Sequence, residues 1–110
     1  MSTFGLALRE AIDSLGRVCV GIDPHAPLLA QWGLEDSAAG AREFGLRTIE
    51  AVAGHVAAVK PQVAFYERHG SAGIAALEDV IAAAREAGVL CIVDAKRGDI
   101  GSTMQGYADA

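Results

Sequence analysis

The sequence is poor in features that mark several large classes of protein. Its 110 residues include two cysteines, three prolines and one tryptophan, and no Cys-x-x-Cys motif or Cys/His cluster occurs. This scarcity argues against a disulfide-rich secreted domain and against a structural zinc site. We expect Cys19 and Cys91, each inside an apolar run, to be buried thiols in a reducing cytoplasm. No stretch reaches the roughly 18 apolar residues of a membrane span, and the N-terminus lacks the features of a signal peptide.

Basic residues are also scarce. Nine Lys and Arg stand against 14 Asp and Glu, a net charge of −5, and no Lys/Arg cluster interrupts that balance. The sequence therefore predicts neither a nucleic-acid partner nor a membrane partner. With 52% hydrophobic and 21% charged residues, the chain is unlike a disordered one, and its length suits one small domain.

Apolar periodicity alternates between strand-like and helix-like along the chain. Strands are predicted at 17–23, 56–60 and 89–96, and helices at about 3–15, at about 37–53, and from a capping Ser71 to Gly88. The helical stripes that predict buried faces are Phe4, Leu8, Ala11, Ile12 and Leu15; Ala41, Phe44, Ile49 and Val52; and Ile74, Leu77, Ile81 and Ala84. This alternation indicates an α/β class with parallel strands, either a (β/α) barrel or an open doubly wound sheet.

Three parallel strands leave two unpaired edges, and a whole (β/α)8 barrel needs about 250 residues. "STMQGYADA", at the end of the chain, reads as the start of a further helix. We therefore expect residues 1–110 to be a single partial barrel domain. It would hold a leading helix and about three βα units from the N-terminal portion of a longer protein.

Each predicted strand ends in an ionisable residue. Residues two apart share one face of a strand, so Asp94 and Lys96 follow Leu90 and Ile92 on one side, with Val89, Cys91, Val93 and Ala95 on the other, against the helices. Lys60 ends the second strand, and Asp23 ends the first. Taken singly, such residues are most often solvated strand ends. Three successive strands with this ending predict a charged site at the carboxyl edge of the sheet.

Alternating charges at Lys60, Asp94, Lys96 and Asp99 suit one kind of chemistry. Each charge offsets the desolvation of the next, which keeps the lysines protonated. A protonated lysine can deliver a proton to a developing carbanion, while a nearby carboxylate disfavours an anionic group on the substrate. Decarboxylation fits this description. Aldolases and isomerases with strand-end lysines remain open at this point.

Three segments carry a family resemblance. "DAKRGDIGST" resembles the D-x-K-x-x-D-I-x-x-T signature of orotidine 5′-monophosphate decarboxylases, and "VGIDPH" and "VKPQVAFYERHG" resemble other segments of the second subgroup, which is typical of many bacteria. The likeness runs in order from about residue 17 to 107. It implies a TIM barrel that converts orotidine 5′-monophosphate to uridine 5′-monophosphate in de novo pyrimidine synthesis.

The resemblance also implies a role for each matched residue. Lys96 would protonate C6 of the pyrimidine after carbon dioxide leaves, with Asp94 beside the substrate carboxylate and Lys60 between Asp94 and the ribose. Asp23 would hydrogen-bond the ribose hydroxyls. The residues implied to act across a homodimer interface, in the site of the partner subunit, are Asp99, Ile100 and Thr103.

No metal or organic cofactor is implied by this family. A related family, the magnesium-dependent 3-keto-gulonate-6-phosphate decarboxylases, shares the D-x-K-x-x-D core. The resemblance to that family implies a metal-binding glutamate at the position of Lys60, and the cation that stands here would repel magnesium. The phosphate-binding loops that the resemblance implies come late in the barrel, so we expect the 110-residue chain alone to be inactive. A noncatalytic half-barrel and another phosphosugar-metabolising barrel enzyme remain alternatives.

The remaining polar and aromatic candidates have structural explanations. We expect Trp32 to pack under the first loop, and Tyr66 and Glu67 to pack at a helix start rather than to position Lys60. The histidines at 25, 55 and 69 are scattered without metal-ligand spacing, and we expect them at the surface or in loops.

Overall fold

The computed structural model describes residues 3–95. In chain order its elements are α1 (Phe4–Leu15), β1 (Cys19–Ile22), α2 (Ala26–Gln31), α3 (Ala38–Val52), β2 (Ala58–Pro61), α4 (Ala64–Glu67), α5 (Gly70–Glu86) and β3 (Leu90–Cys91). The three longer helices and three strands lie where the sequence predicted them. The short helices α2 and α4 occupy segments for which no helix was predicted.

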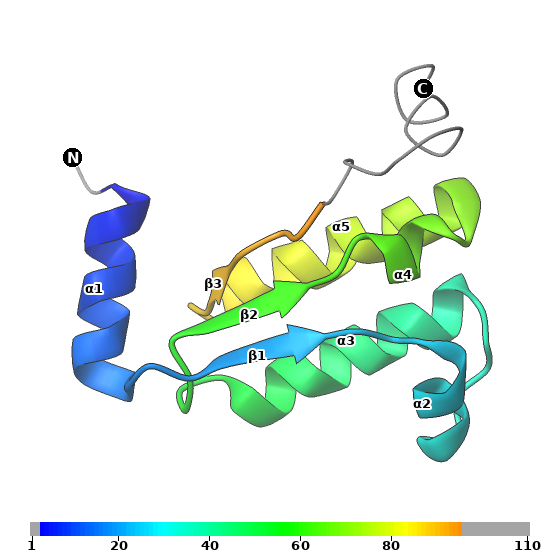
Figure 1. Cartoon of the computed structure of the whole chain (residues 1–110), viewed down its shortest axis with the longest axis horizontal. Coiled ribbons are helices and arrows are strands. Elements are labelled where there is room, and N and C mark those ends of the chain that lie inside the picture. The colour runs from blue at the N-terminus through cyan, green and yellow to red at the C-terminus, as the bar shows by residue number, and fades with distance from the viewer. Residues whose placement is uncertain (1–2, 96–110) are drawn as a thin grey trace, which may run out of the picture.

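A parallel three-stranded sheet in the order β1-β2-β3 forms the centre of the fold (Figure 1). Cys19 pairs with Ala58 in β2, and Ala58 pairs with Leu90 in β3. Beyond β3 an isolated parallel bridge joins Gln62 to Asp94. The predicted α/β class with parallel strands is confirmed.

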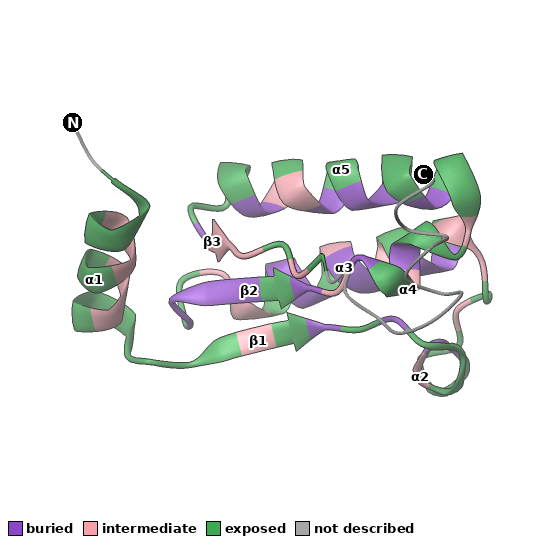
Figure 2. Ribbon diagram, turned by 45° about the horizontal axis from the view of Figure 1, so that its top comes forward, coloured by how far each residue is buried: buried purple, intermediate pink, exposed green. Residues whose placement is uncertain are grey.

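Helices α3 and α5 pack against each other and cover one face of the sheet (Figures 1 and 2). The buried cluster between the sheet and these helices includes Ile22, Leu29, Phe44, Val59, Val63, Tyr66, Leu77, Val80 and Ala84. The stripe predicted for α3 is confirmed, because Ala41, Phe44 and Ile49 are buried and Val52 packs on them. In α5 the stripe holds only from Leu77 onward, since Ile74 at its start is 36% exposed.

Most helix ends lie where capping residues in the sequence predict them, but one predicted cap is wrong. Ser37 accepts a hydrogen bond from the Gly40 amide at 3.1 Å and so begins α3. Gly16 and Gly88, both with positive φ, follow α1 and α5 as the predicted stops. The predicted cap at Ser71 is wrong: α5 already begins at Gly70, after His69, whose side chain makes no capping bond. Gly70 has a φ of 70° and allows the sharp turn out of α4.

Helix α1 stands away from the other helices at the end of the sheet from which the strands begin (Figure 1). None of its residues is buried, so the buried face predicted from its stripe is wrong for the residues that the structure describes. Periodicity identifies an amphipathic helix but not the surface that covers it. Phe4 instead borders an open cavity with the end of α5 and the start of β3.

Two other burial predictions are wrong in part. Cys19 is exposed, because it pairs with Ala58 on the sheet face opposite to α3 and α5; Cys91 is partly buried against the core, and both thiols are free. Val93 was predicted to face the helices but is 43% exposed. Regular pairing of β3 ends at Cys91, so strand alternation no longer determines where Val93 points.

Candidate active site

Asp23, Lys60 and Asp94 lie at the carboxyl ends of three adjacent parallel strands. Lys60 is paired with Gly21 in β1, and Asp94 is bridged to Gln62, two residues beyond Lys60. The Asp23 carboxylate lies over Gly21, because a Cβ placed there would be 3.7 Å from Asp23 Oδ2. Gly21 and Lys60 alternate with residues buried under the helices, which places these three charged residues toward the other, open face.

One ion pair joins two of the predicted site residues. Lys60 Nζ lies 4.0 Å from Asp94 Oδ2, and the two side chains are 47% and 18% exposed. Unit charges at this separation attract by about 1 kcal/mol in bulk water and by about 4 kcal/mol near a protein surface. Because Lys60 is exposed, the net stabilisation from this ion pair lies at the low end of that range. The pair therefore contributes a fixed arrangement of charge more than it contributes stability.

Backbone hydrogen bonds hold the three strand ends together around Gln62. The Gln62 amide donates to the Ile22 carbonyl at 3.1 Å, next to Asp23. The Asp94 amide donates to the Pro61 carbonyl at 3.0 Å, and the Val63 amide donates back to the Asp94 carbonyl at 3.0 Å. Because each end is bonded to its neighbour, the side chains at 23, 60 and 94 come from one connected piece of backbone. Sequence reasoning gave Gln62 no role.

An ammonium paired with one carboxylate, with a second carboxylate at the end of the neighbouring strand, can bind the hydroxyls of a polar, anionic small molecule and repel a carboxylate at one position. Among residues 3–95, no three His, Cys, Asp or Glu side chains gather in a way that could hold a metal ion. In the same part of the chain, no helix is both long and apolar enough to cross a membrane.

Comparison with known proteins decides the family. Residues 16–110 match the model of the orotidine 5′-phosphate decarboxylase / HUMPS family. The chain belongs to this family. It is 56% identical over 110 residues to the orotidine 5′-phosphate decarboxylase of Streptomyces coelicolor and 59% identical over 110 residues to that of Nocardioides sp.. All of the chain is covered in both alignments, and it spans 40% of the length of each relative.

Solved structures of this family share the fold. A crystal structure of a Streptomyces avermitilis protein assigned as an orotidine 5′-phosphate decarboxylase superposes with a TM-score of 0.83 at 56% identity, covering 100% of this chain and 39% of that one. The Leishmania donovani OMP decarboxylase superposes with a TM-score of 0.70 at 40% identity, covering 97% of this chain and 38% of that one. The prediction that the chain corresponds to the N-terminal portion of a TIM barrel is confirmed.

Part of the predicted orotidine 5′-phosphate decarboxylase site lies outside the described residues. These positions are Lys96, Asp99, Ile100 and Thr103. Their roles, and the continuation of the charged row beyond Lys60 and Asp94, stay predictions.

The structural explanation is confirmed for Tyr66 and holds only in part for Trp32. Tyr66 lies in α4 and is fully buried. Its hydroxyl donates to the Ala41 carbonyl of α3 at 3.3 Å, so Tyr66 packs against the helices. Burial also raises the pKa of Tyr66 above its ordinary value of 10.0. Trp32 contacts Phe44 with ring centroids 4.2 Å apart and the ring planes tilted by 36°, but it remains 40% exposed, so it packs under the loop only in part.

The histidines divide between the two expectations. His55 is exposed, and His25 lies in the loop before α2, whose Leu28 amide donates to His25 Nδ1 at 3.4 Å. His69 lies in the turn between α4 and α5, as expected of a loop residue, but its side chain is only 13% exposed. Its Nε2 is buried without a hydrogen-bond partner among the described residues and lies 4.0 Å from Asp36 Oδ1.

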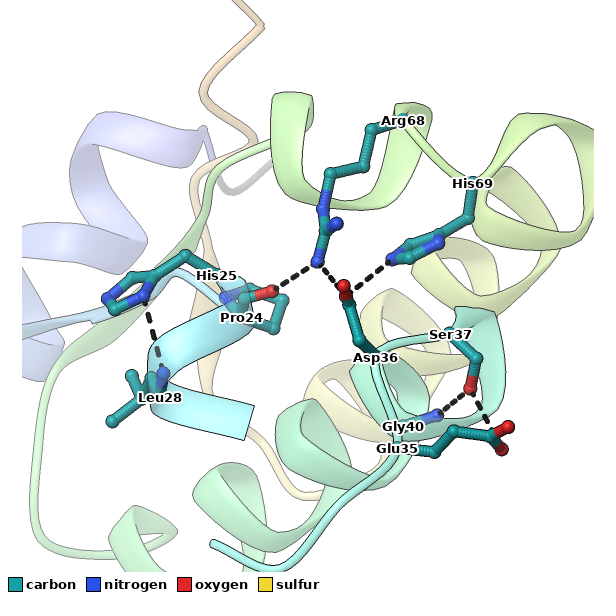
Figure 3. Close-up of polar contacts among 9 residues, drawn as sticks. All are labelled: Pro24, His25, Leu28, Glu35, Asp36, Ser37, Gly40, Arg68 and His69. Atoms are coloured by element: carbon teal, nitrogen blue, oxygen red, sulfur yellow. Dashed lines mark hydrogen bonds and ion pairs between the residues drawn. The ribbon is translucent and has the colours of Figure 1, made fainter. Parts of the chain in front are cut away.

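Sequence reasoning missed a polar cluster beside the strand ends (Figure 3). Arg68 Nη2 lies 2.5 Å from Asp36 Oδ1 and donates to the Pro24 carbonyl at 3.4 Å. That hydrogen bond from Arg68 lowers the pKa of Asp36 below its ordinary 3.8. The bonded residues are 32 and 44 positions apart in the sequence, so no local pattern could have signalled the cluster.

Proposed function

We propose that the complete protein containing this chain is an orotidine 5′-monophosphate decarboxylase, which releases carbon dioxide and forms uridine 5′-monophosphate in the cytoplasm. The observation that carries the proposal is the Lys60–Asp94 pair, 4.0 Å apart at the carboxyl ends of neighbouring parallel strands. Family membership and relatives named as this enzyme support it.

The chemistry proceeds by loss of one charged group and gain of one proton at C6 of the pyrimidine. Asp94 stands beside the substrate carboxylate and disfavours its charge. The bond from C6 to the carboxylate breaks, the electron pair stays on C6, and carbon dioxide leaves as a neutral molecule. Lys96, as an ammonium, stabilises that electron pair and donates the proton that completes the product. Lys60 bridges Asp94 and the ribose.

The remaining residues bind and enclose the nucleotide. Asp23 hydrogen-bonds the ribose hydroxyls, for which its position over Gly21 beside the Lys60 strand is suitable. Asp99 completes the charged row from the partner subunit of a homodimer, and Ile100 and Thr103 line the pocket of that subunit. Neither a metal nor an organic cofactor takes part.

The test is the loss of orotidine 5′-monophosphate, followed by absorbance, with the complete protein and its variants. Lys96→Ala and Asp94→Asn should each reduce kcat/KM by roughly a hundredfold or more, the usual scale for a positioned proton donor or charged group. Arg42→Gln is the matched control, because it breaks an exposed 2.9 Å ion pair with Asp79 between α3 and α5, the helices that cover the opposite face of the sheet. Turnover should survive EDTA.

Two outcomes contradict the proposal. One is a complete protein without turnover of orotidine 5′-monophosphate; the other is a Lys96→Ala variant as active as the unaltered protein. Magnesium-dependent turnover of a keto-sugar phosphate would favour the phosphosugar alternative instead. The 110-residue chain by itself should show only background rates, because binding energy from the remote phosphate drives much of such catalysis and no loop for it is expected within the chain.

A further inference from the structure

Arg68 connects three segments that are far apart in the sequence. It follows α4 directly, and α4 follows β2, the strand that carries Lys60. Its guanidinium contacts the Pro24 carbonyl after β1 and the Asp36 carboxylate between α2 and α3 (Figure 3). A single side chain thus ties the segment after β1 to the segment after β2.

The contact with Pro24 acts on the residue next to Asp23. Pro24 is fully buried, and its ring restricts φ to about −65°. A carbonyl clamped at this point therefore limits the directions in which the Asp23 carboxylate can point. Backbone hydrogen bonds around Gln62 already join the end of β2 to the ends of β1 and β3. Arg68 adds a second attachment one residue beyond Asp23.

Asp36 holds the guanidinium in place. Arg68 Nη2 reaches both the Asp36 carboxylate, at 2.5 Å, and the Pro24 carbonyl, at 3.4 Å. The His69 imidazole stands on the other side of Asp36, with its Nε2 at 4.0 Å (Figure 3). The Arg68 and Asp36 side chains are 35% and 51% exposed, so their ion pair adds little to stability. Its main effect is to orient Arg68 toward Pro24.

We propose that Arg68 is a positioning residue that acts through Pro24 to hold Asp23 against the ribose of the nucleotide. This inference rests on the proposed function, in which Asp23 binds the ribose hydroxyls. Asp23 holds the ribose before and during the reaction alike, so loss of its positioning weakens binding without changing the chemical step. Such a loss raises KM and leaves kcat nearly unchanged.

The experiment is a double-mutant cycle in the complete protein with Arg68→Gln, Asp23→Asn and the pair. Arg68→Gln alone should raise KM by roughly three- to tenfold, the scale of one ordinary hydrogen bond, with kcat within about twofold. In the Asp23→Asn background the same change should have almost no further effect, because Arg68 acts only through Asp23. The dissociation constant of uridine 5′-monophosphate, measured by calorimetry, should follow KM.

Arg42→Gln again serves as the control, since it removes a comparable exposed arginine–aspartate pair and should leave KM unchanged. If Arg68→Gln does not fold, Arg68→Lys takes its place. Lysine keeps the charge that Asp36 attracts, but its flexible stem lacks the rigid guanidinium plane that aims Nη2 at both acceptors. An unchanged KM overturns the inference, as does an increase that is equally large with and without Asp23. If the unaltered protein has no turnover, the proposed function fails and this inference falls with it.

Discussion

Replacement of Gly45 by alanine tests the packing that supports the sheet. Gly45 lies in α3 where this helix crosses α5. A Cβ at this position would be 2.6 Å from Val80 Cγ2 and 2.7 Å from the Tyr66 hydroxyl oxygen. Val80 and Tyr66 are both fully buried, and the Tyr66 hydroxyl is bonded to the Ala41 carbonyl, so neither can yield without moving a helix. We predict that Gly45→Ala destabilises the protein.

The expected change in the free energy of unfolding is the difference between two opposing effects. Overpacking a core by one methyl group costs about 1–3 kcal/mol. Alanine gains up to about 1 kcal/mol over glycine inside a helix. Because two buried groups would be closer than 3.0 Å, the upper part of the first range applies, and the net loss should be about 2 kcal/mol. At a slope of about 2 kcal/mol per molar urea, this loss lowers the unfolding midpoint by roughly 1 M.

Urea unfolding of the complete protein, followed by circular dichroism, measures this change. Gly5→Ala is the matched control. Gly5 also lies in a helix, but a Cβ there would meet only the Thr3 hydroxyl oxygen, at 4.0 Å. This variant should keep or raise the midpoint. If the midpoint of Gly45→Ala equals or exceeds that of the unaltered protein, then α3 and α5 do not approach each other as closely as the structure describes.

Three further predictions concern titrating groups. Burial raises the pKa of Tyr66, so its contribution to stability is complete below pH 10 and falls as the pH rises further. Tyr66→Phe should lower the free energy of unfolding by about 1 kcal/mol at neutral pH and should reduce the loss of stability above pH 10. Urea unfolding midpoints measured at neutral pH and above pH 10 would show both effects. Arg68 lowers the pKa of Asp36 below 3.8; stability should therefore decline as the pH falls through the lowered value, and Asp36→Asn should remove that part of an acid titration followed by fluorescence. Burial also raises the pKa of Cys91, so iodoacetamide should modify this thiol more slowly than it modifies free cysteine, until urea unfolds the chain. Equal rates would contradict the burial of Cys91.

The sequence carried enough information to predict the fold class and the order of the long elements. Its apolar spacing changes from period 2 to period 3.6 and back, and parallel strands follow from that alternation. Charged residues directly after three apolar runs were sufficient to predict that Asp23, Lys60 and Asp94 gather at one edge, because carboxyl ends of parallel strands coincide. The buried stripe of α3 followed from the same local rules.

Burial was harder to predict, because it depends on surfaces far away in the chain. The stripe of α1 predicted a buried face, yet none of its residues is buried in the structure as described. Cys19 was predicted to be buried as part of an apolar run, but the pairing of β1 with β2 places it on the face that α3 and α5 do not cover. His69 lies in a turn, as expected, but only the tertiary structure shows that its side chain is nearly enclosed beside Asp36.

By itself, the sequence determined which residues alternate along each strand and which charges follow the strand ends, since both depend on neighbours in the chain. Only the tertiary structure decided that Lys60 meets Asp94 at 4.0 Å, through the bridge at Gln62. It alone also brought Arg68 to Pro24 and Asp36 across 44 and 32 positions of sequence. Such contacts arise from sheet register and helix packing, which bring together residues that no local spacing relates.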